Sequence, residues 1–200
     1  MTEHGNTQRS CVTKQLTSFD QVERLYSERL QKDFARDEIK PLASMRRAWK
    51  NGIYDCYGLF SEDEILGYAF FVRLGRDYLL DYLAVEEHHR DEGLGSLFLR
   101  QLAECLAEAD RVVCEVEDPD TAEDDMTRAQ RERRLEFYLR SGYRKTSVTA
   151  EVFGVDYRIL ELSSESRRSD EQLRDVYTEF YRATLPAIFF RTCFRTGIKG

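Results

Sequence analysis

The chain has 200 residues, of which 42% are hydrophobic and 34% are charged, and its formal net charge is −7. A chain of this length and composition can fill one core, with an appendage at most. The acidic balance argues against nucleic-acid binding, because neutralising phosphates requires a basic face. It is better suited to neutral or cationic small substrates.

Membrane insertion and secretion are not expected from the sequence. It has no apolar run near the roughly 20 residues that a spanning helix needs. The N-terminal residues Met1–Asn6 lack the apolar stretch of a signal peptide. The five cysteines are scattered without a C-x-x-C pair, which favours reduced thiols over a disulfide framework. We therefore expect a cytoplasmic protein.

The first part of the chain carries two helical patterns after a polar tail. Residues 1–14 are expected to be a disordered tail. A capping-box spacing that starts at Ser18 predicts a helix over residues 19–31. A second helix should have Pro41 at its first position and end at Asn51.

The middle of the chain has the pattern of a β-meander. Runs rich in aromatic and aliphatic residues, separated by short polar turns, predict antiparallel strands at 54–60, 65–74 and 78–85. A helical pattern from Phe98 to Leu106 then precedes a β-rich run at 111–117. A helix between two strands implies a crossover, so the strand at 111–117 should lie parallel to the strand at 78–85.

The pattern after this strand alternates between helix and strand. Residues 118–130 are acidic and predict a surface loop, and residues 131–140 predict a helix. Strands should follow near 143–151 and 157–162, and an amphipathic helix should begin after Ser169.

The domain organisation that we expect is one domain over residues 15–165 and a helical appendage over 166–200. The end of the appendage is more apolar than a free tail, with Ile188, Phe189 and Phe194. These side chains either cover the core of the same chain or pack on a second copy in a homodimer.

A glycine-containing run follows the strand at 78–85 and precedes the next helical pattern. Its residues are Arg90, Asp91, Glu92, Gly93, Leu94, Gly95 and Ser96. Unpaired N–H groups at a helix N-terminus carry the positive end of the helix dipole, and glycine lets a ligand approach the backbone closely. The run therefore predicts a phosphate-binding site. It is neither G-x-G-x-x-G nor G-x-x-x-x-G-K-S/T, so nucleotide cofactors have little support.

The run from Arg90 to Gly95 matches R/Q-x-x-G-x-G/A, and here the sequence resembles the GNAT acetyltransferase superfamily. It is also similar to that family at Leu83-Ala84-Val85, in the strand Val113–Glu117, and in Arg134–Tyr143, which resembles an F-Y-x-x-x-G-F/Y helix end. The resemblance implies a mixed α/β fold. In it a twisted, mostly antiparallel sheet has helices on both faces and a splayed pair of parallel strands.

The function that this resemblance implies is transfer of an acetyl group from acetyl-CoA to a primary amine, directly within a ternary complex. Leu83, Ala84 and Val85 would bind pantetheine, and the run from Arg90 to Ser96 would bind the CoA phosphates. Arg133 and Arg134 would either reach these phosphates as well or pair with the acidic loop. The acceptor would be a small-molecule or peptide amine. The alternative is a non-catalytic CoA-binding regulatory or interaction module with the same fold.

Tyr138 occupies the position of the family's tyrosine acid. A phenol near the departing CoA thiolate is chemically suited to protonate it and would also contact the cofactor. Alternatively, Tyr138 is only a core aromatic on the same helical stripe as Leu135.

Three carboxylates are candidates for the base that deprotonates the acceptor ammonium. Glu115 sits where some protein N-terminal acetyltransferases of the superfamily carry a glutamate, and Asp81 and Glu117 are its rivals. Strand alternation predicts Glu115 and Glu117 on one face, and Asp81 on the same face as Leu83 and Val85. Each carboxylate could instead pair with an arginine or face water, because burying an unpaired charge is costly.

No metal site is predicted. His88 and His89 are adjacent, so their side chains point apart on extended backbone, and no cysteine or third histidine lies at ligand spacing. A solvated loop is the simpler interpretation of this pair.

Overall fold

The computed structural model describes residues 10–36, 38–89, 92–162 and 169–199. The strands are β1 Cys11–Gln15, β2 Tyr54–Ser61, β3 Glu64–Leu74, β4 Asp77–Val85, β5 Arg111–Glu117, β6 Tyr143–Val152, β7 Val155–Leu162 and β8 Phe194–Ile198. The α-helices are α1 Phe19–Leu25, α2 Gln31–Asp33, α3 Leu42–Lys50, α4 Leu94–Cys105, α5 Asp125–Arg140, α6 Asp170–Thr184 and α7 Ala187–Cys193. A π-helical turn, Tyr26–Leu30, joins α1 to α2, and short 3-10 turns cover Glu87–His89 and Pro119–Thr121.

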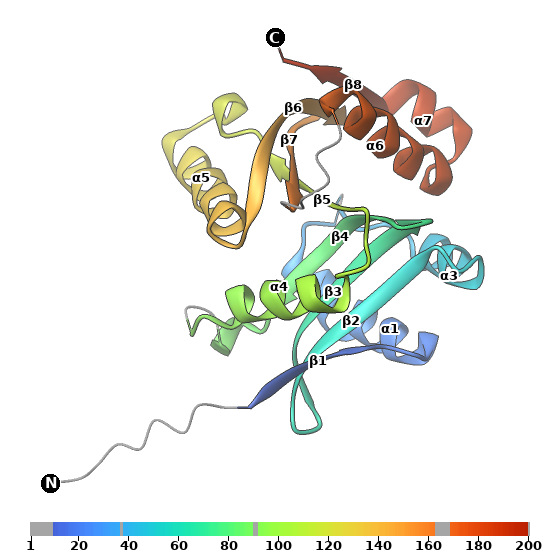
Figure 1. Ribbon diagram of the computed structural model, residues 1–200, viewed down its shortest axis with the longest axis vertical. Helices are drawn as coiled ribbons and strands as arrows, with labels where there is room; N and C mark the ends of the chain where they lie inside the picture. Colours follow the sequence, from blue (N-terminus) through green and yellow to red (C-terminus); the bar gives the residue numbers. More distant parts are fainter. Residues whose placement is uncertain (1–9, 37, 90–91, 163–168, 200) are drawn as a thin grey trace, which may run out of the picture.

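All eight strands form one sheet, in the order β1-β2-β3-β4-β5-β7-β6-β8. Strands β4 and β5 run parallel, and every other neighbouring pair in this sheet is antiparallel. Figure 1 shows β1–β4 in one half of the molecule and β5–β8 in the other. The predicted fold class, the meander and the parallel crossover from β4 to β5 are confirmed.

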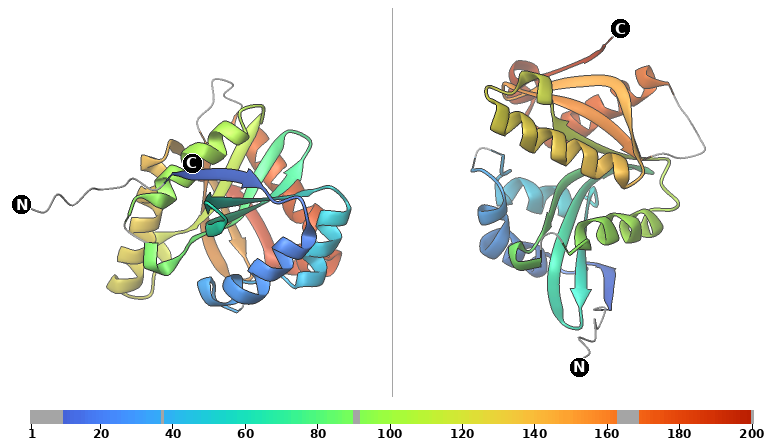
Figure 2. Two further views of the ribbon diagram at one scale, coloured as in Figure 1. Left: turned by 90° about the horizontal axis from the view of Figure 1, so that it is seen from below. Right: turned by 90° about the vertical axis from the view of Figure 1, so that its left-hand side faces the viewer.

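Helices cover the sheet on both faces, and each face has its own hydrophobic core (Figure 2). The first face is covered by α1, α3 and α6, whose buried residues include Val22, Met45 and Tyr177. The second face is covered by α4 and α5, with Phe98 and Leu135 in its core.

Two helix starts differ from the prediction. Helix α5 begins at Asp125, within the stretch predicted as a loop, because the Asp124 side chain caps it by accepting from the N–H of Thr127 at 2.8 Å. Pro41 precedes the first turn of α3 with an extended ψ of 136°, so it is the N-cap residue and not the first helical residue.

Both ends of the described chain contribute strands. Residues 1–9 of the predicted tail lie outside the described residues, whereas Cys11–Gln15 form β1 along the edge of β2. The C-terminal appendage contains two helices and also β8, which pairs with β6. Both strands have five residues, too few for alternation to stand out in the sequence.

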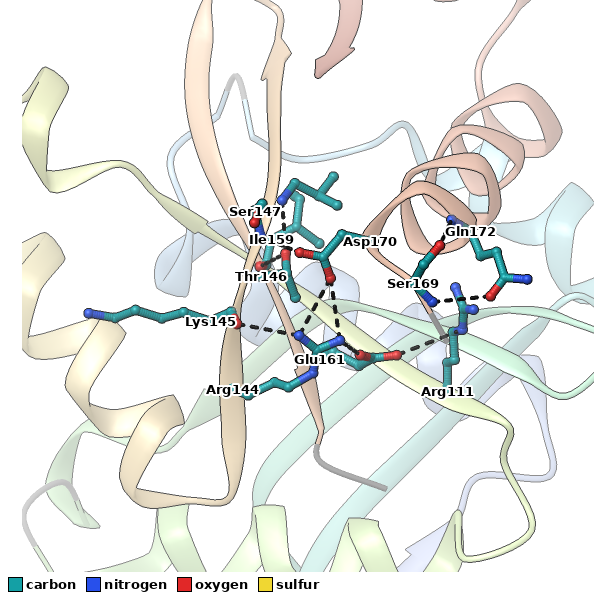
Figure 3. A network of polar contacts seen from close by, with 11 residues as sticks. Arg111, Arg144, Lys145, Thr146, Ser147, Ile159, Glu161, Ser169, Asp170 and Gln172 are labelled. Carbon is teal, nitrogen blue, oxygen red and sulfur yellow. Dashed lines mark hydrogen bonds and ion pairs between the residues drawn. The ribbon is translucent and has the colours of Figure 1, made fainter. Parts of the chain in front are cut away.

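A network of ion pairs fixes the start of α6 on the sheet (Figure 3). The Arg144 guanidinium pairs with Glu161 and also lies 3.5 Å from the Asp170 carboxylate. The Arg111 side chain lies 3.7 Å from Glu161, and both residues are buried. The N–H of Ser147 donates to Asp170 at 2.7 Å. Helix α6 therefore begins at a fixed point, and it extends across the first face to contact β4.

No helix in the part of the chain that the structure describes is long and apolar enough to cross a membrane.

Candidate active site

The parallel strands β4 and β5 separate partway along their length. Their ladder joins Asp77–Leu80 to Arg111–Cys114 and ends there, although β4 continues to Val85 and β5 to Glu117. Beyond this point β4 pairs only with β3, and β5 pairs only with β7. The strand edges that face each other after the split therefore have no ladder between them.

A β-bulge lies at the point of separation. Tyr82 pairs with Phe70 and Leu80 with Phe71, so Asp81 has no partner residue on β3. An extra residue in one strand shifts the alternation of the side chains after it. Tyr82 therefore belongs to the core of the first face, and Leu83 packs on the second.

The bulge corrects the predicted orientation of Asp81. Its carboxylate meets Tyr54 in the first-face core, whereas Leu83 and Val85 pack on the second face. The prediction that Asp81 shares a face with these two residues was wrong, because it assumed unbroken alternation.

Asp81 is held by two donors. The Lys40 ammonium lies 2.5 Å from one carboxylate oxygen, and the Tyr54 hydroxyl donates to the other at 2.7 Å. The Asp81 side chain is only 8% exposed. The Tyr82 hydroxyl fixes the segment that carries Lys40, because it accepts from the Lys40 N–H at 2.9 Å and donates to the Glu38 carbonyl at 2.9 Å. Asp81 thus anchors a loop to the bulge.

Glu115 lies across from Asp81, where β5 leaves β4. The Tyr181 hydroxyl lies 2.8 and 2.7 Å from its two carboxylate oxygens, and Tyr181 is on α6, so Glu115 faces the first face. Burial raises the pKa of Glu115 to about 7, although the hydrogen bond from Tyr181 and the positive charge of Lys40 both lower it. A carboxyl group with this pKa can exchange a proton near neutral pH.

Glu117, the third candidate base, pairs with arginines. Its carboxylate lies 3.2 Å from Arg131 and 3.6 Å from Arg134, both on α5. Arg134, which was expected to reach the CoA phosphates, thus has a carboxylate partner, and its side chain is 56% exposed. Arg131 also donates to the Asp118 carbonyl at 3.1 Å.

Tyr138 lies on the second face, opposite Glu115. It is 8% exposed and contacts the rings of Phe137 and Tyr143 edge-on at 5.2 and 5.3 Å. Burial raises the pKa of the Tyr138 phenol, and the neighbouring Cys114 adds to the increase. The phenol therefore stays protonated at neutral pH and can act as a proton donor.

The predicted phosphate-binding run is only partly described, because Arg90 and Asp91 lie outside the described residues. Gly93 precedes α4 with φ of +78°, a conformation that favours glycine, and no described side chain caps this helix. The Glu92 carboxylate lies 3.1 Å from His89 Nδ1. Leu94 is buried in the second-face core and Ser96 is half-buried in the first turn.

Gly95 has a packing role. A Cβ at this position would lie 3.2 Å from two ring carbons of Phe137, so the missing side chain lets α4 approach α5. The predicted pantetheine residues Leu83, Ala84 and Val85 pair with β3 along one edge of β4. Their other edge lies beyond the end of the β4–β5 ladder and faces the split, and all three residues are half-buried.

Sequence reasoning missed the donors around the two carboxylates. Lys40, Tyr54 and Tyr181 come from a loop, a strand and a C-terminal helix that are far apart in sequence. The amphipathic pattern that predicted a helix after Ser169 could not indicate which group the hydroxyl of Tyr181 would meet.

Several solved structures with the same fold are described as acetyltransferases. A protein of Bacteroides thetaiotaomicron, described as a GNAT-family acetyltransferase, superposes with a TM-score of 0.69 at 18% identity, over 89% of this chain and 98% of that chain. The ribosomal-protein-S18-alanine N-acetyltransferase of Escherichia coli superposes with a TM-score of 0.55 at 14% identity, over 80% of this chain and 99% of that chain. A GNAT-family acetyltransferase of Elizabethkingia anophelis with acetyl-CoA bound superposes with a TM-score of 0.55 at 15% identity, over 77% of this chain and 98% of that chain. No curated protein matches the sequence at a significant level.

The sheet that opens between β4 and β5 is thus the GNAT fold, the architecture of a class of acyltransferases. Residues 53–145 match the family model described as the acetyltransferase (GNAT) domain. The chain therefore carries a match to a GNAT acetyltransferase domain over residues 53–145, within a fold that it shares with GNAT acetyltransferases.

Proposed function

We propose that the protein transfers an acetyl group from acetyl-CoA to a primary amine, directly within a ternary complex, and that Glu115 is the base. The observation that carries this proposal is the position of the Glu115 carboxyl group at the point where β4 and β5 separate. Its pKa of about 7 suits the removal of a proton from an ammonium group near neutral pH.

The donor site would follow the split and end at α4. Pantetheine would lie along Leu83, Ala84 and Val85, whose edge toward β5 carries no ladder. The N-terminus of α4 offers unpaired N–H groups to the pyrophosphate, beginning next to Gly93. The relative from Elizabethkingia anophelis, which has acetyl-CoA bound, supports this use of the fold.

Proton transfer would take place on both faces of the sheet. Glu115 on the first face removes a proton from the acceptor ammonium, and the free amine attacks the thioester carbonyl carbon. A new C–N bond forms, the C–S bond breaks, and Tyr138 on the second face donates its proton to the leaving thiolate. Cys114 and Glu115 are adjacent on β5, so their side chains point to opposite faces of the sheet, Cys114 toward Tyr138 and Glu115 toward Tyr181. The acid Tyr138 and the base Glu115 would therefore act from opposite sides of one ligand.

We propose that Asp81 anchors the site and is not the base. Both of its oxygens already accept from strong donors, the Lys40 ammonium and the Tyr54 hydroxyl, whereas the two oxygens of Glu115 share the hydroxyl of Tyr181. An acceptor that reaches Glu115 would share the site with Lys40 and Asp81.

The acceptor that we propose is a small-molecule or peptide amine. Proteins with the same fold are named for both kinds of acceptor. The E. coli enzyme is named for an alanine of ribosomal protein S18, and another is named an aminoglycoside 6'-N-acetyltransferase. Asp81 and Glu115 bring two carboxyl groups to the site and Lys40 one ammonium, a balance that suits a cationic acceptor.

The test combines acetyl-CoA binding with turnover. Calorimetry should detect acetyl-CoA binding, and a panel of amines should include at least one that releases CoA thiol. Binding without thiol release from any amine would favour the non-catalytic module, and absence of binding would contradict both functions.

Replacing Glu115 with Gln tests the base directly. Turnover at pH 8 should fall by on the order of 10² to 10⁴, the range for loss of general acid–base catalysis, while acetyl-CoA affinity changes little. In the wild type, turnover should rise with pH through about 7 and then level off, because the ionised carboxyl is the active form. Glu117→Gln is the matched control and should keep this profile; a wild-type rate in Glu115→Gln would reject the assignment.

A further inference from the structure

We infer that Tyr181, on the C-terminal helix α6, is a positioning residue whose hydroxyl orients the Glu115 carboxylate, so that α6 completes the active site. The inference rests on the proposed function, in which Glu115 is the base. Tyr181 lies on α6, outside residues 53–145, the part that matches the family model.

The contact between the two side chains is close and largely shielded from water. The Tyr181 hydroxyl lies nearly equidistant from the two Glu115 oxygens, at 2.8 and 2.7 Å, and Tyr181 is 7% exposed. A hydroxyl that donates to an anion forms a short, strong hydrogen bond, more so where water is excluded. Such a bond favours the ionised carboxylate and restricts its rotation.

An aromatic column holds the Tyr181 ring in place. The column consists of Tyr181, Phe194 and Phe190. The Tyr181 ring stacks on Phe194 at 4.6 Å with 23° between planes, and Phe194 stacks on Phe190 at 5.2 Å with 20°. Tyr177 packs against Tyr181 from one helical turn away, at 5.2 Å. The hydroxyl therefore cannot leave Glu115 unless several buried rings move.

Both ends of α6 are also fixed. Its start is tied to β6 and β7 through the ion-pair network around Asp170 (Figure 3). Near its end, Ala183 and Thr184 line a small cavity together with Lys40 and Tyr54, the two donors to Asp81. The helix thus connects the ion-pair network at one end to the Asp81 anchor at the other, with Tyr181 between them.

Charged and titratable groups from four elements face Glu115. Burial opposes its ionised form most strongly and nearby Asp81 also opposes it, whereas Tyr181, Lys40 and Tyr177 favour it. Among the described residues, the carboxyl group interacts with Lys40, Asp81, Tyr157, Tyr177 and Tyr181, and also with Cys114, its neighbour in the chain, whose side chain points to the second face. Removing the Tyr181 hydroxyl leaves the burial and the Asp81 charge in place, so Glu115 should ionise at higher pH.

The experiment compares Tyr181→Phe with the wild type by two pH titrations. One follows turnover against pH, and the other follows the Glu115 carboxyl carbon by NMR in protein labelled with ¹³C-glutamate, without substrate. Glu115→Gln identifies the signal. We expect both midpoints to move up by on the order of one pH unit, so that turnover at pH 7 falls about fivefold and recovers at high pH.

A control variant on the same helix separates this effect from helix damage. Thr178→Val removes a hydroxyl that donates at 2.7 Å to the Arg174 carbonyl within α6 and has no contact with Glu115. It should leave both titrations unchanged. Melting temperatures of all variants verify that each is folded, and the conservative Tyr→Phe change keeps the aromatic column intact.

The outcomes distinguish the inference from the function on which it rests. If Glu115→Gln keeps full turnover, the base assignment fails, and with it the catalytic role of Tyr181. If Glu115→Gln loses turnover but Tyr181→Phe moves neither titration, the proposed function stands and the inference is overturned. Upward shifts in Tyr181→Phe, absent in Thr178→Val, support it.

Discussion

The surroundings of the Glu115 carboxyl group destabilise its ionised form. Burial raises its pKa from 4.5 to about 7. In the folded protein it therefore keeps a proton over a pH range in which the unfolded chain has lost it. Stability follows the difference in bound protons, so the contribution of Glu115 to stability falls as the pH rises from about 4.5 to about 7, and it stays low above that range.

A stability measurement at two pH values tests this property without any substrate. Glu115→Gln removes the ionisation and keeps a side chain of similar size. Relative to the wild type, the variant should gain unfolding free energy between pH 4.5 and pH 8, by at most on the order of 3 kcal/mol. Urea denaturation at both pH values measures the change. A stability difference that is the same at both would contradict the raised pKa.

Tyr138 gives a second prediction for a single residue. Its phenol is buried and protonated near β5, so Tyr138→Phe should lower turnover by on the order of 10² or more and leave acetyl-CoA binding nearly unchanged. Steady-state rates and calorimetry give the two quantities. Tyr143→Phe is the control, because Tyr143 is a buried tyrosine whose ring contacts Tyr138 at 5.3 Å. Equal rates in Tyr138→Phe and the wild type would leave Tyr138 as a core aromatic only.

Among the elements, β4 shows a limit of predicting which face a side chain lies on from its alternation along a strand. The strand was predicted at 78–85, and the structure has it at Asp77–Val85. The bulge at Asp81 was not predictable, because one unpaired residue depends on the register with β3 and not on a local pattern. A local pattern was also insufficient at α5. The run of acidic residues there predicted a loop, whereas Asp124 caps the start of a helix.

The start of α4 contains two glycines with different surroundings. A Cβ on Gly93 would meet nothing within 4 Å, so a side chain there would occupy the space in front of the helix N-terminus. Gly93→Val should therefore weaken acetyl-CoA binding by crowding the phosphate site, and its φ of +78° should add about 1 to 2 kcal/mol of backbone strain. Calorimetry and urea denaturation measure the two effects.

Gly95→Ala is the matched control for this site. Its new methyl group would press on the Phe137 ring at 3.2 Å and separate α4 from α5, so it should mainly lower stability. If Gly93→Val binds acetyl-CoA as well as the wild type does, the N-terminus of α4 is not the phosphate site.

At the scale of the whole molecule, local patterns predicted most elements and their order, although not β1 and β8, and one crossover predicted the parallel pair. They did not predict which distant segments meet. The apolar C-terminus allowed two interpretations, and the structure separates its members: Phe190 and Phe194 pack on the core of this chain, whereas Ile188 and Phe189 are 63% and 46% exposed. These exposed residues remain candidates for contact with a second copy.

The candidate site was predictable to the same extent. Glu115, Asp81 and Tyr138 lie on elements with clear patterns, and the resemblance assigned them possible roles. Lys40 and Tyr181 reach the site only because a loop and a C-terminal helix converge on it, 41 and 66 positions away from their carboxylate partners. No periodicity within one element encodes such a meeting.

Strand β8 pairs with β6, and its first residue, Phe194, supports the Tyr181 ring. During synthesis on the ribosome, β4, β5 and α4 emerge well before α6 and β8. A growing chain could therefore form much of its donor-binding half while Glu115 still lacks the Tyr181 hydroxyl. The Glu115 carboxyl group, the base that we propose, would gain its hydrogen bond from Tyr181 only after β8 has joined the sheet, so the order of translation would delay the completion of this contact.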